Sequence, residues 1–119
     1  MADLVRNSIA GVSVLHSRPE ARREGCAVII CLGGLSGTKA ALLRHKRILA
    51  FADAGYGLIL CDHYNAGERR DKRQEALSNQ DGLAVCQKAH FWKAIYLTSL
   101  EVPEVITWAT QTFGTDRVA

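Results

Sequence analysis

The stretch Ala27-Val28-Ile29-Ile30-Cys31-Leu32-Gly33-Gly34-Leu35-Ser36-Gly37-Thr38-Lys39 decides the fold. Residues 26–32 are all apolar, and no polar residue alternates with them, which predicts a central strand buried on both faces. The glycines that follow predict a tight turn. A helix is expected from about residue 38 to 54, with Ser36 or Thr38 capping its first backbone amides.

Residues 57–62 form the next strand, which is apolar until its last residue, so we expect strand, helix and strand to make a right-handed βαβ unit. Gly55 is expected to end the helix in a left-handed conformation. Upstream, residues 9–16 alternate loosely and predict a strand with one buried face, ending before Pro19. One side of this strand carries Val12, Val14 and His16, and the other carries Gly11, Ser13 and Leu15. The apolar stripe of the helix should consist of Ala41, Leu42, His45, Ile48, Leu49 and Ala52.

The second half of the chain predicts a long polar loop and then a long helix. Residues 63–81 are polar, and loops of that length in a compact domain are often functional. Residues 83–113 are mostly helical in pattern, with a kink or break expected at Pro103 and an end at Gly114. Residues 116–119 look like the opening of a further strand.

Composition limits the class of protein. The 119 residues suit one domain, 1–119, and 48% hydrophobic with 23% charged residues is ordinary globular composition. A net charge of +3 is too small to indicate a nucleic-acid partner. No apolar run approaches the roughly 18 residues that span a bilayer, and residues 1–6 do not resemble a secretory signal.

The four cysteines favour a reducing compartment. None belongs to a C-x-x-C pair, and no Cys/His pair has zinc-ligand spacing. Cys31 and Cys61 lie inside apolar runs, where a free cysteine acts as a small buried hydrophobe. We therefore expect a cytoplasmic protein with no metal, no cofactor and no membrane partner.

The glycine loop admits several interpretations. A phosphate loop needs Gly-Lys followed by Ser or Thr, but Thr38 precedes Lys39 and Ala40 follows it. A nucleophile elbow needs G-x-S-x-G, and Thr38 stands where its last glycine belongs. An oxyanion loop needs only two glycines whose backbone N–H groups can turn toward a reacting carbonyl, which Gly33 and Gly34 supply. A tight turn without chemistry remains the structural alternative.

The order of four segments resembles the N-terminal half of an α/β-hydrolase. These segments are residues 11–19, residues 28–39, residues 54–62 with Gly67-Glu68-Arg69, and Phe91-Trp92 with the helix leading to 116–119. The chain is most similar to small bacterial carboxylesterases of the dienelactone-hydrolase and prolyl-oligopeptidase-like branch. The resemblance implies an α/β fold with three α/β/α layers, holding the N-terminal strands and first two helices of the sheet.

The resemblance also implies site residues. Gly33 matches the glycine of the family's His-Gly pair, and Gly34 the residue whose backbone N–H donates to the oxyanion. Leu32 departs from the pattern, because the family's histidine usually stands there. His63 and Tyr64 would lie near the family's cleft, although an exposed loop position suits them equally. Asp62 matches a loop-organising aspartate, whereas His16, His45 and His90 are expected to be structural.

The catalytic triad lies beyond residue 119 in this resemblance. In the family the strand opening at Val118 runs into G-x-S-x-G, and the acid and histidine follow later. We expect this truncated domain alone to be inactive, and to act on a small-molecule ester only if a C-terminal half completes it. Without the nucleophile strand, the strand 27–32 has an uncovered edge, which predicts a homodimer through that edge, a complex with a complementary C-terminal half, or poor solubility. The alternatives are a non-catalytic α/β binding module or self-associating domain, and a phosphate-binding domain using residues 33–39.

Overall fold

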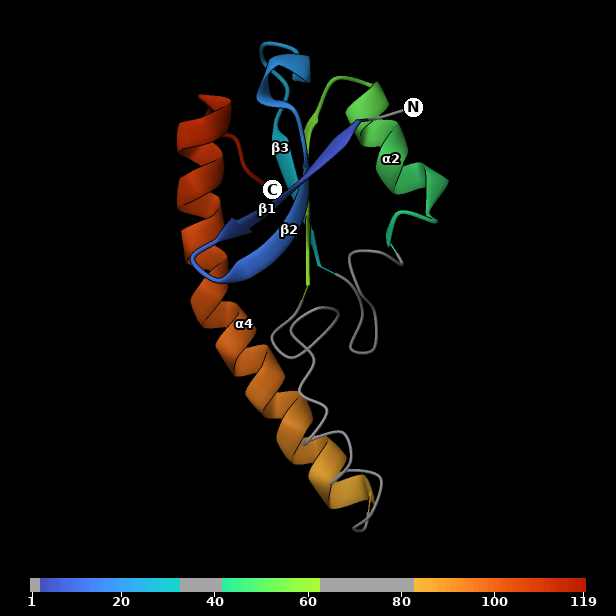
Figure 1. Cartoon of the computed structure of the whole chain (residues 1–119), viewed down its shortest axis with the longest axis vertical. Helices are drawn as coiled ribbons and strands as arrows, with labels where there is room; N and C mark the ends of the chain where they lie inside the picture. The colour runs from blue at the N-terminus through green and yellow to red at the C-terminus, as the bar shows by residue number, and fades with distance from the viewer. Residues whose placement is uncertain (1–2, 33–41, 63–82) are drawn as a thin grey trace.

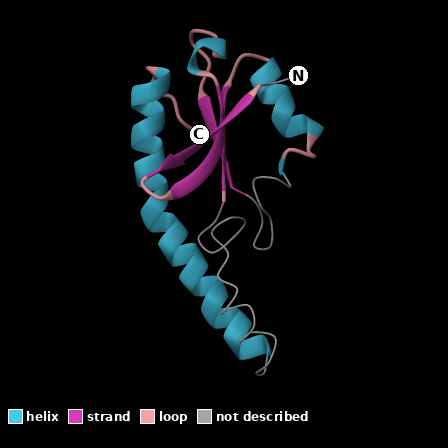
Figure 2. Ribbon diagram, in the orientation of Figure 1, coloured by secondary structure: helices cyan, strands magenta, loops and turns pink. Residues whose placement is uncertain are grey.

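A computed structural model describes residues 3–32, 42–62 and 83–119. These residues form a four-stranded sheet with helices on both sides, so the expected three layers are confirmed (Figures 1 and 2). The strands are β1 (Leu4–Ile9), β2 (Val12–Ser17), β3 (Val28–Leu32) and β4 (Gly57–Cys61), and the helices are η1 (Pro19–Ala21), α2 (Lys46–Asp53) and α4 (Leu83–Phe113).

The strand order is β1-β2-β4-β3. β1 pairs antiparallel with β2, and β2 pairs antiparallel with β4. β3 and β4 run parallel, with Val28 opposite Gly57 and Leu32 opposite Cys61, so the predicted βαβ pairing is confirmed. α2 lies on one side of the sheet and α4 on the other (Figure 1).

The main core lies between the sheet and the C-terminal half of α4. The expected alternation in β2 is confirmed, since Val12, Val14 and His16 are buried toward this side. Opposite them, α4 buries residues spaced four apart, which is one face of a helix. The cluster consists of Ile9, Val12, Val14, Val28, Ile59, Cys61, Val105, Ala109 and Phe113.

The predicted single strand over residues 9–16 is wrong in its boundaries, because a tight hairpin divides it. Ala10 (φ 50°) and Gly11 (φ 83°) form a two-residue turn between Ile9 and Val12. Two consecutive positive φ angles match the right-handed twist of the flanking strands. The chain therefore gains β1 as an extra edge strand.

The helix expected over residues 38–54 is interrupted at His45, and residues 38–41 lie outside the described residues. His45 is extended (φ −90°, ψ 101°) and precedes Lys46, the first residue of α2, without a side-chain cap. Of the predicted apolar stripe, Leu42, Ile48, Leu49 and Ala52 are half-buried, whereas His45 is exposed and Ala41 lies outside the described residues. Among the described residues Leu42 is helical, and α2 begins at Lys46 after the extended His45.

The C-terminal end of α2 follows the prediction closely. Gly55 has φ 100°, its N–H donates to Ala52 O at 3.1 Å, and Tyr56 N–H donates to Phe51 O at 3.0 Å. These two bonds form the Schellman motif. The rings of Phe51 and Tyr56, 5.8 Å apart and perpendicular, add the hydrophobic contact that accompanies it.

β3 is less buried than predicted. Only Val28 is buried; Ile29, Ile30 and Cys31 are half-buried, and the Leu32 side chain is 39% exposed. The reason lies in its neighbours within the described part of the chain. β4 pairs with β3 along its length, but on the other side only residues 117–119 approach it.

α4 is a single helix across Pro103, so no break occurs there. Figure 1 shows that its axis changes direction along its length, in keeping with the expected kink. Gly114 (φ 65°) ends the helix as predicted. Three apolar residues of α4 are exposed, namely Ile95 (44%), Leu100 (56%) and Ile106 (38%).

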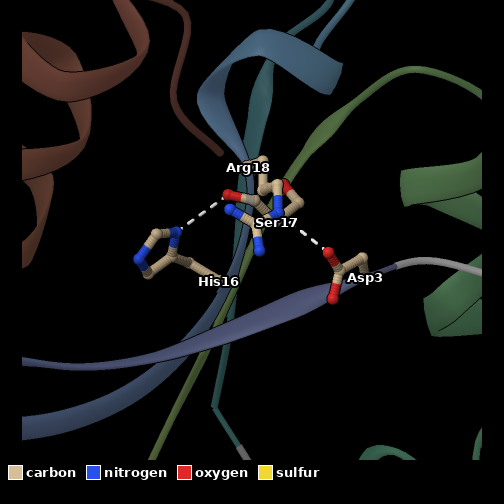
Figure 3. A network of polar contacts seen from close by, with 4 residues as sticks. All are labelled: Asp3, His16, Ser17 and Arg18. Carbon is tan, nitrogen blue, oxygen red and sulfur yellow. Dashed lines mark hydrogen bonds and ion pairs between the residues drawn. The ribbon is translucent and has the colours of Figure 1, made fainter.

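The carboxyl end of β2 is held by polar contacts (Figure 3). His16 Nδ1 donates to Ser17 O at 2.8 Å, and Arg18 Nε forms an ion pair with Asp3 at 2.8 Å. The His16 ring packs edge-on to Trp108, with centroids 4.9 Å apart, and its buried Nε2 has no hydrogen-bond partner. His16 therefore packs in the core, and its structural role stays a prediction.

Candidate functional site

The candidate site lies at the carboxyl ends of β3 and β4. Because the two strands are parallel and Leu32 lies opposite Cys61, both end at the same edge of the sheet. Ligands of open α/β sheets bind outside the carboxyl ends of the strands. The sheet thus brings together the two chain segments that the sequence singled out, 33–39 and 63–81, at their starting points.

The predicted site residues themselves lie outside the described residues. This applies to Gly33 and Gly34 of the oxyanion loop and to His63 and Tyr64 of the cleft wall. It applies also to Ser36, Thr38 and Lys39, which carried the alternative interpretations. The structure describes only the residues that precede these segments, Leu32 at the end of β3 and Asp62 after β4.

Asp62 is a buried carboxylate at this edge. Its side chain is 2% exposed and takes part in interactions within the protein. Beside it lies a cavity of about 10 Å³, comparable in size to one water molecule. The cavity is lined by Val12, Leu32, Cys61, Asp62, Thr98, Glu101, Val102 and Val105. Asp62 is therefore buried at the point where β4 ends.

A larger open groove of about 440 Å³ continues from Leu32 along α4. It is lined by Leu32, Ile95, Thr98, Ser99, Val102 and Pro103. Thr98, Ser99 and Val102 were not predicted from the sequence as groove residues. The spacing 95, 98, 99, 102 places all four on one helix face and was the available signal.

The thiol of Cys31 has a pKa that departs from its ordinary value. Partial burial in β3 disfavours the thiolate and raises the pKa of Cys31. Such a thiol is a poor nucleophile at neutral pH. Among the described residues Cys26, Cys31 and Cys61 are free thiols, and no group of His, Cys, Asp or Glu could hold a metal ion.

A further parallel strand begins beside β3. Val118 forms a parallel bridge with Val28. Val28 N–H donates to Arg117 O at 2.8 Å, Ala119 N–H donates to Val28 O at 2.9 Å, and Ile30 N–H donates to Ala119 O at 2.8 Å. The strand opening predicted at residues 116–119 is thus confirmed, and it lies on the side of β3 away from β4.

Neither the family models nor the curated proteins that were searched contain a match to this chain. The crystal structure of TT1662 from Thermus thermophilus is similar to it, with a TM-score of 0.61 and 26% sequence identity. The likeness covers 96% of this chain and 43% of TT1662, so the chain spans less than half of that protein's length. With its mixed sheet and flanking helices, the chain has an α/β-hydrolase-like fold.

None of the described helices is long and apolar enough to cross a membrane.

Proposed function

We propose that this chain supplies the N-terminal part of a serine carboxylesterase. One observation carries the proposal: residues 117–119 begin a parallel strand next to β3, on the side away from β4. The resemblance puts the nucleophile strand in this position. A serine just beyond residue 119 would then lie at the same sheet edge as the loop that follows Leu32.

In this proposal Gly34 donates its backbone N–H to the oxyanion, and Gly33 allows the loop to approach the substrate. His63 and Tyr64 contribute to the cleft wall. A triad supplied by the rest of the protein forms and hydrolyses the acyl-enzyme. Oxyanion donors by themselves give only residual acceleration, so residues 1–119 alone should not hydrolyse esters at a useful rate.

The test compares two polypeptides: residues 1–119, and the longest product of the same reading frame. Both are assayed with p-nitrophenyl esters and labelled with a fluorophosphonate, which reacts with activated serines. The longer product should hydrolyse the ester and carry one label beyond residue 119. Labelling of Ser36 in the short chain would overturn the proposal in favour of a nucleophile in the glycine loop.

Gly34 can be tested within the longer product. Gly34→Pro removes the proposed N–H donor and should lower kcat by roughly 10²- to 10³-fold. Gly34→Ala keeps the N–H and is the matched control. Equal kcat values for the proline variant and the parent would remove Gly34 from the oxyanion site.

Self-association is the second candidate function, favoured by the outer edge of β3. Residues 117–119 pair with this edge at Val28 and Ile30, and no described strand pairs outward of Leu32. Open edges of this kind pair with other chains. We expect residues 1–119 to sediment as a dimer at tens of micromolar. Leu32→Pro, which removes an outward N–H, should yield monomer, whereas Leu32→Val should not. A monomeric parent chain would exclude this candidate.

A further inference from the structure

The groove along α4 has the size and the wall of a small-ligand site. Its volume of about 440 Å³ lies within the roughly 300–1,000 Å³ of ligand pockets. Leu32, Ile95, Val102 and Pro103 form an apolar wall, and none of the six lining residues is charged. Leu32 and Ile95 remain 39% and 44% exposed, so apolar surface is open to an occupant.

The two polar side chains that line the groove, Ser99 and Thr98, already make interactions within the protein. Ser99 Oγ donates to Tyr96 O at 2.6 Å, within the helix itself. Thr98 is only 7% exposed and makes interactions within the protein. The wall therefore offers dispersion contacts and burial from water in place of charge or hydrogen-bond recognition. An uncharged hydrocarbon group is the chemistry that this wall complements.

The groove is continuous with the candidate site through one residue. Leu32 ends β3, lines the groove and directly precedes Gly33 in the chain. It also lies opposite Cys61, beside the buried Asp62. A hydrocarbon chain lying along α4 would thus have its end at the carboxyl edge of β3.

We infer that the groove formed by Leu32, Ile95, Thr98, Ser99, Val102 and Pro103 binds the acyl chain of a medium-chain ester. This inference rests on the proposed esterase function for the identity of the substrate. The groove sets chain-length preference, since each buried methylene contributes roughly a fourfold gain in binding. Esters with butyryl to octanoyl chains are therefore preferred over acetyl esters.

Octanoate and acetate provide a test that needs no catalysis. Each is titrated into residues 1–119 while the backbone amide signals of Thr98, Ser99 and Val102 are followed by NMR. Octanoate should shift these signals at concentrations at which acetate does not. Ser99→Trp fills the groove and should abolish the shifts, whereas Leu100→Trp, on the neighbouring exposed position, should leave them unchanged. Equal shifts from both acids, or shifts that survive Ser99→Trp, would overturn the inference.

A second variant tests the groove in case Ser99→Trp does not fold. A second assay distinguishes acyl-chain binding in the groove from the esterase function. Ile95→Asn places a polar group in the groove at an exposed position and should weaken octanoate binding by about tenfold. In the longer product, Ser99→Trp should reduce kcat/KM for octanoyl esters by about tenfold and for acetyl esters by less than about twofold. If the longer product hydrolyses esters without this chain-length effect, acyl-chain binding in the groove is rejected and the esterase proposal stands. If octanoate binds but no ester is hydrolysed, the esterase proposal is rejected and the groove remains a binding site for hydrocarbon chains.

Discussion

Ser17 shows how one side chain completes the sheet where backbone pairing ends. The β2–β4 register stops at His16 and Ile59, one residue short of Leu58. Leu58 N–H donates instead to Ser17 Oγ at 2.9 Å, and both residues are buried. A buried N–H without a partner costs about 1–3 kcal/mol, so the hydroxyl replaces a missing strand residue.

Ser17→Ala should therefore lower the free energy of unfolding by about 1–3 kcal/mol, because Leu58 N–H loses its acceptor. Urea denaturation measures this loss. Ser8→Ala, at an exposed position of β1, is the control and should change stability by less than about 0.5 kcal/mol. Equal effects from the two substitutions would mean that the Ser17 hydroxyl does not satisfy Leu58.

Cys31 predicts a pH dependence of stability. Its pKa is raised in the folded protein by burial, whereas the unfolded thiol ionises near its ordinary value of about 8.5. Below that pH both states hold the proton and Cys31 has no effect. As pH rises through the window between the unfolded and the folded pKa, only the unfolded state ionises, so stability is lost.

Urea denaturation of the parent and of Cys31→Val at pH 7 and pH 9.5 isolates this effect. The parent should lose more stability between the two pH values than the variant does, because valine cannot ionise. A variant that loses as much as the parent would show that Cys31 does not contribute.

At the scale of elements, β3, β4 and α4 were predictable because their signals are strong and local. Apolar runs of five or six residues indicate buried strands, and the pattern of a 31-residue helix is long enough to exclude a strand. The start of α2 was not predictable, since residues 42–45 continue the helical stripe yet His45 is extended. The burial of β3 was also misjudged, because it depends on which segments lie beside the strand.

The C-terminal end of α4 is fixed by a residue far away in sequence. Arg22 donates to Phe113 O at 3.1 Å and to Cys26 O at 2.6 Å, joining α4 to the segment before β3. Its cation also complements the negative end of the helix dipole. This contact was not predicted from the sequence, because Arg22 and Phe113 lie 91 residues apart in the chain.

Arg22→Met should lower the free energy of unfolding by about 1.5–3 kcal/mol, because two carbonyl groups lose a charged donor. Thermal denaturation followed by circular dichroism gives the shift. Arg47→Met, exposed on α2, is the matched control and should be nearly neutral. An unchanged midpoint for Arg22→Met would show that the α4 end does not depend on this link.

At the scale of the whole molecule, the arrangement places the ends of two parallel strands, the groove of α4 and the opening of the next strand together. The strand order and the likeness to TT1662 agree with the α/β-hydrolase-like fold that the resemblance implied. The groove could not be predicted, because it requires Leu32 and α4 to meet across the sheet edge. Side chains 60 or more residues apart in sequence carry no local signal of that contact.

The most direct measurement is p-nitrophenyl butyrate hydrolysis by the full product of this reading frame, with residues 1–119 assayed beside it. The account predicts hydrolysis by the longer product, a loss of about 10²- to 10³-fold in Gly34→Pro, and no activity above background for residues 1–119. A longer product that folds and leaves the ester intact, or a short chain as active as the long one, would contradict it.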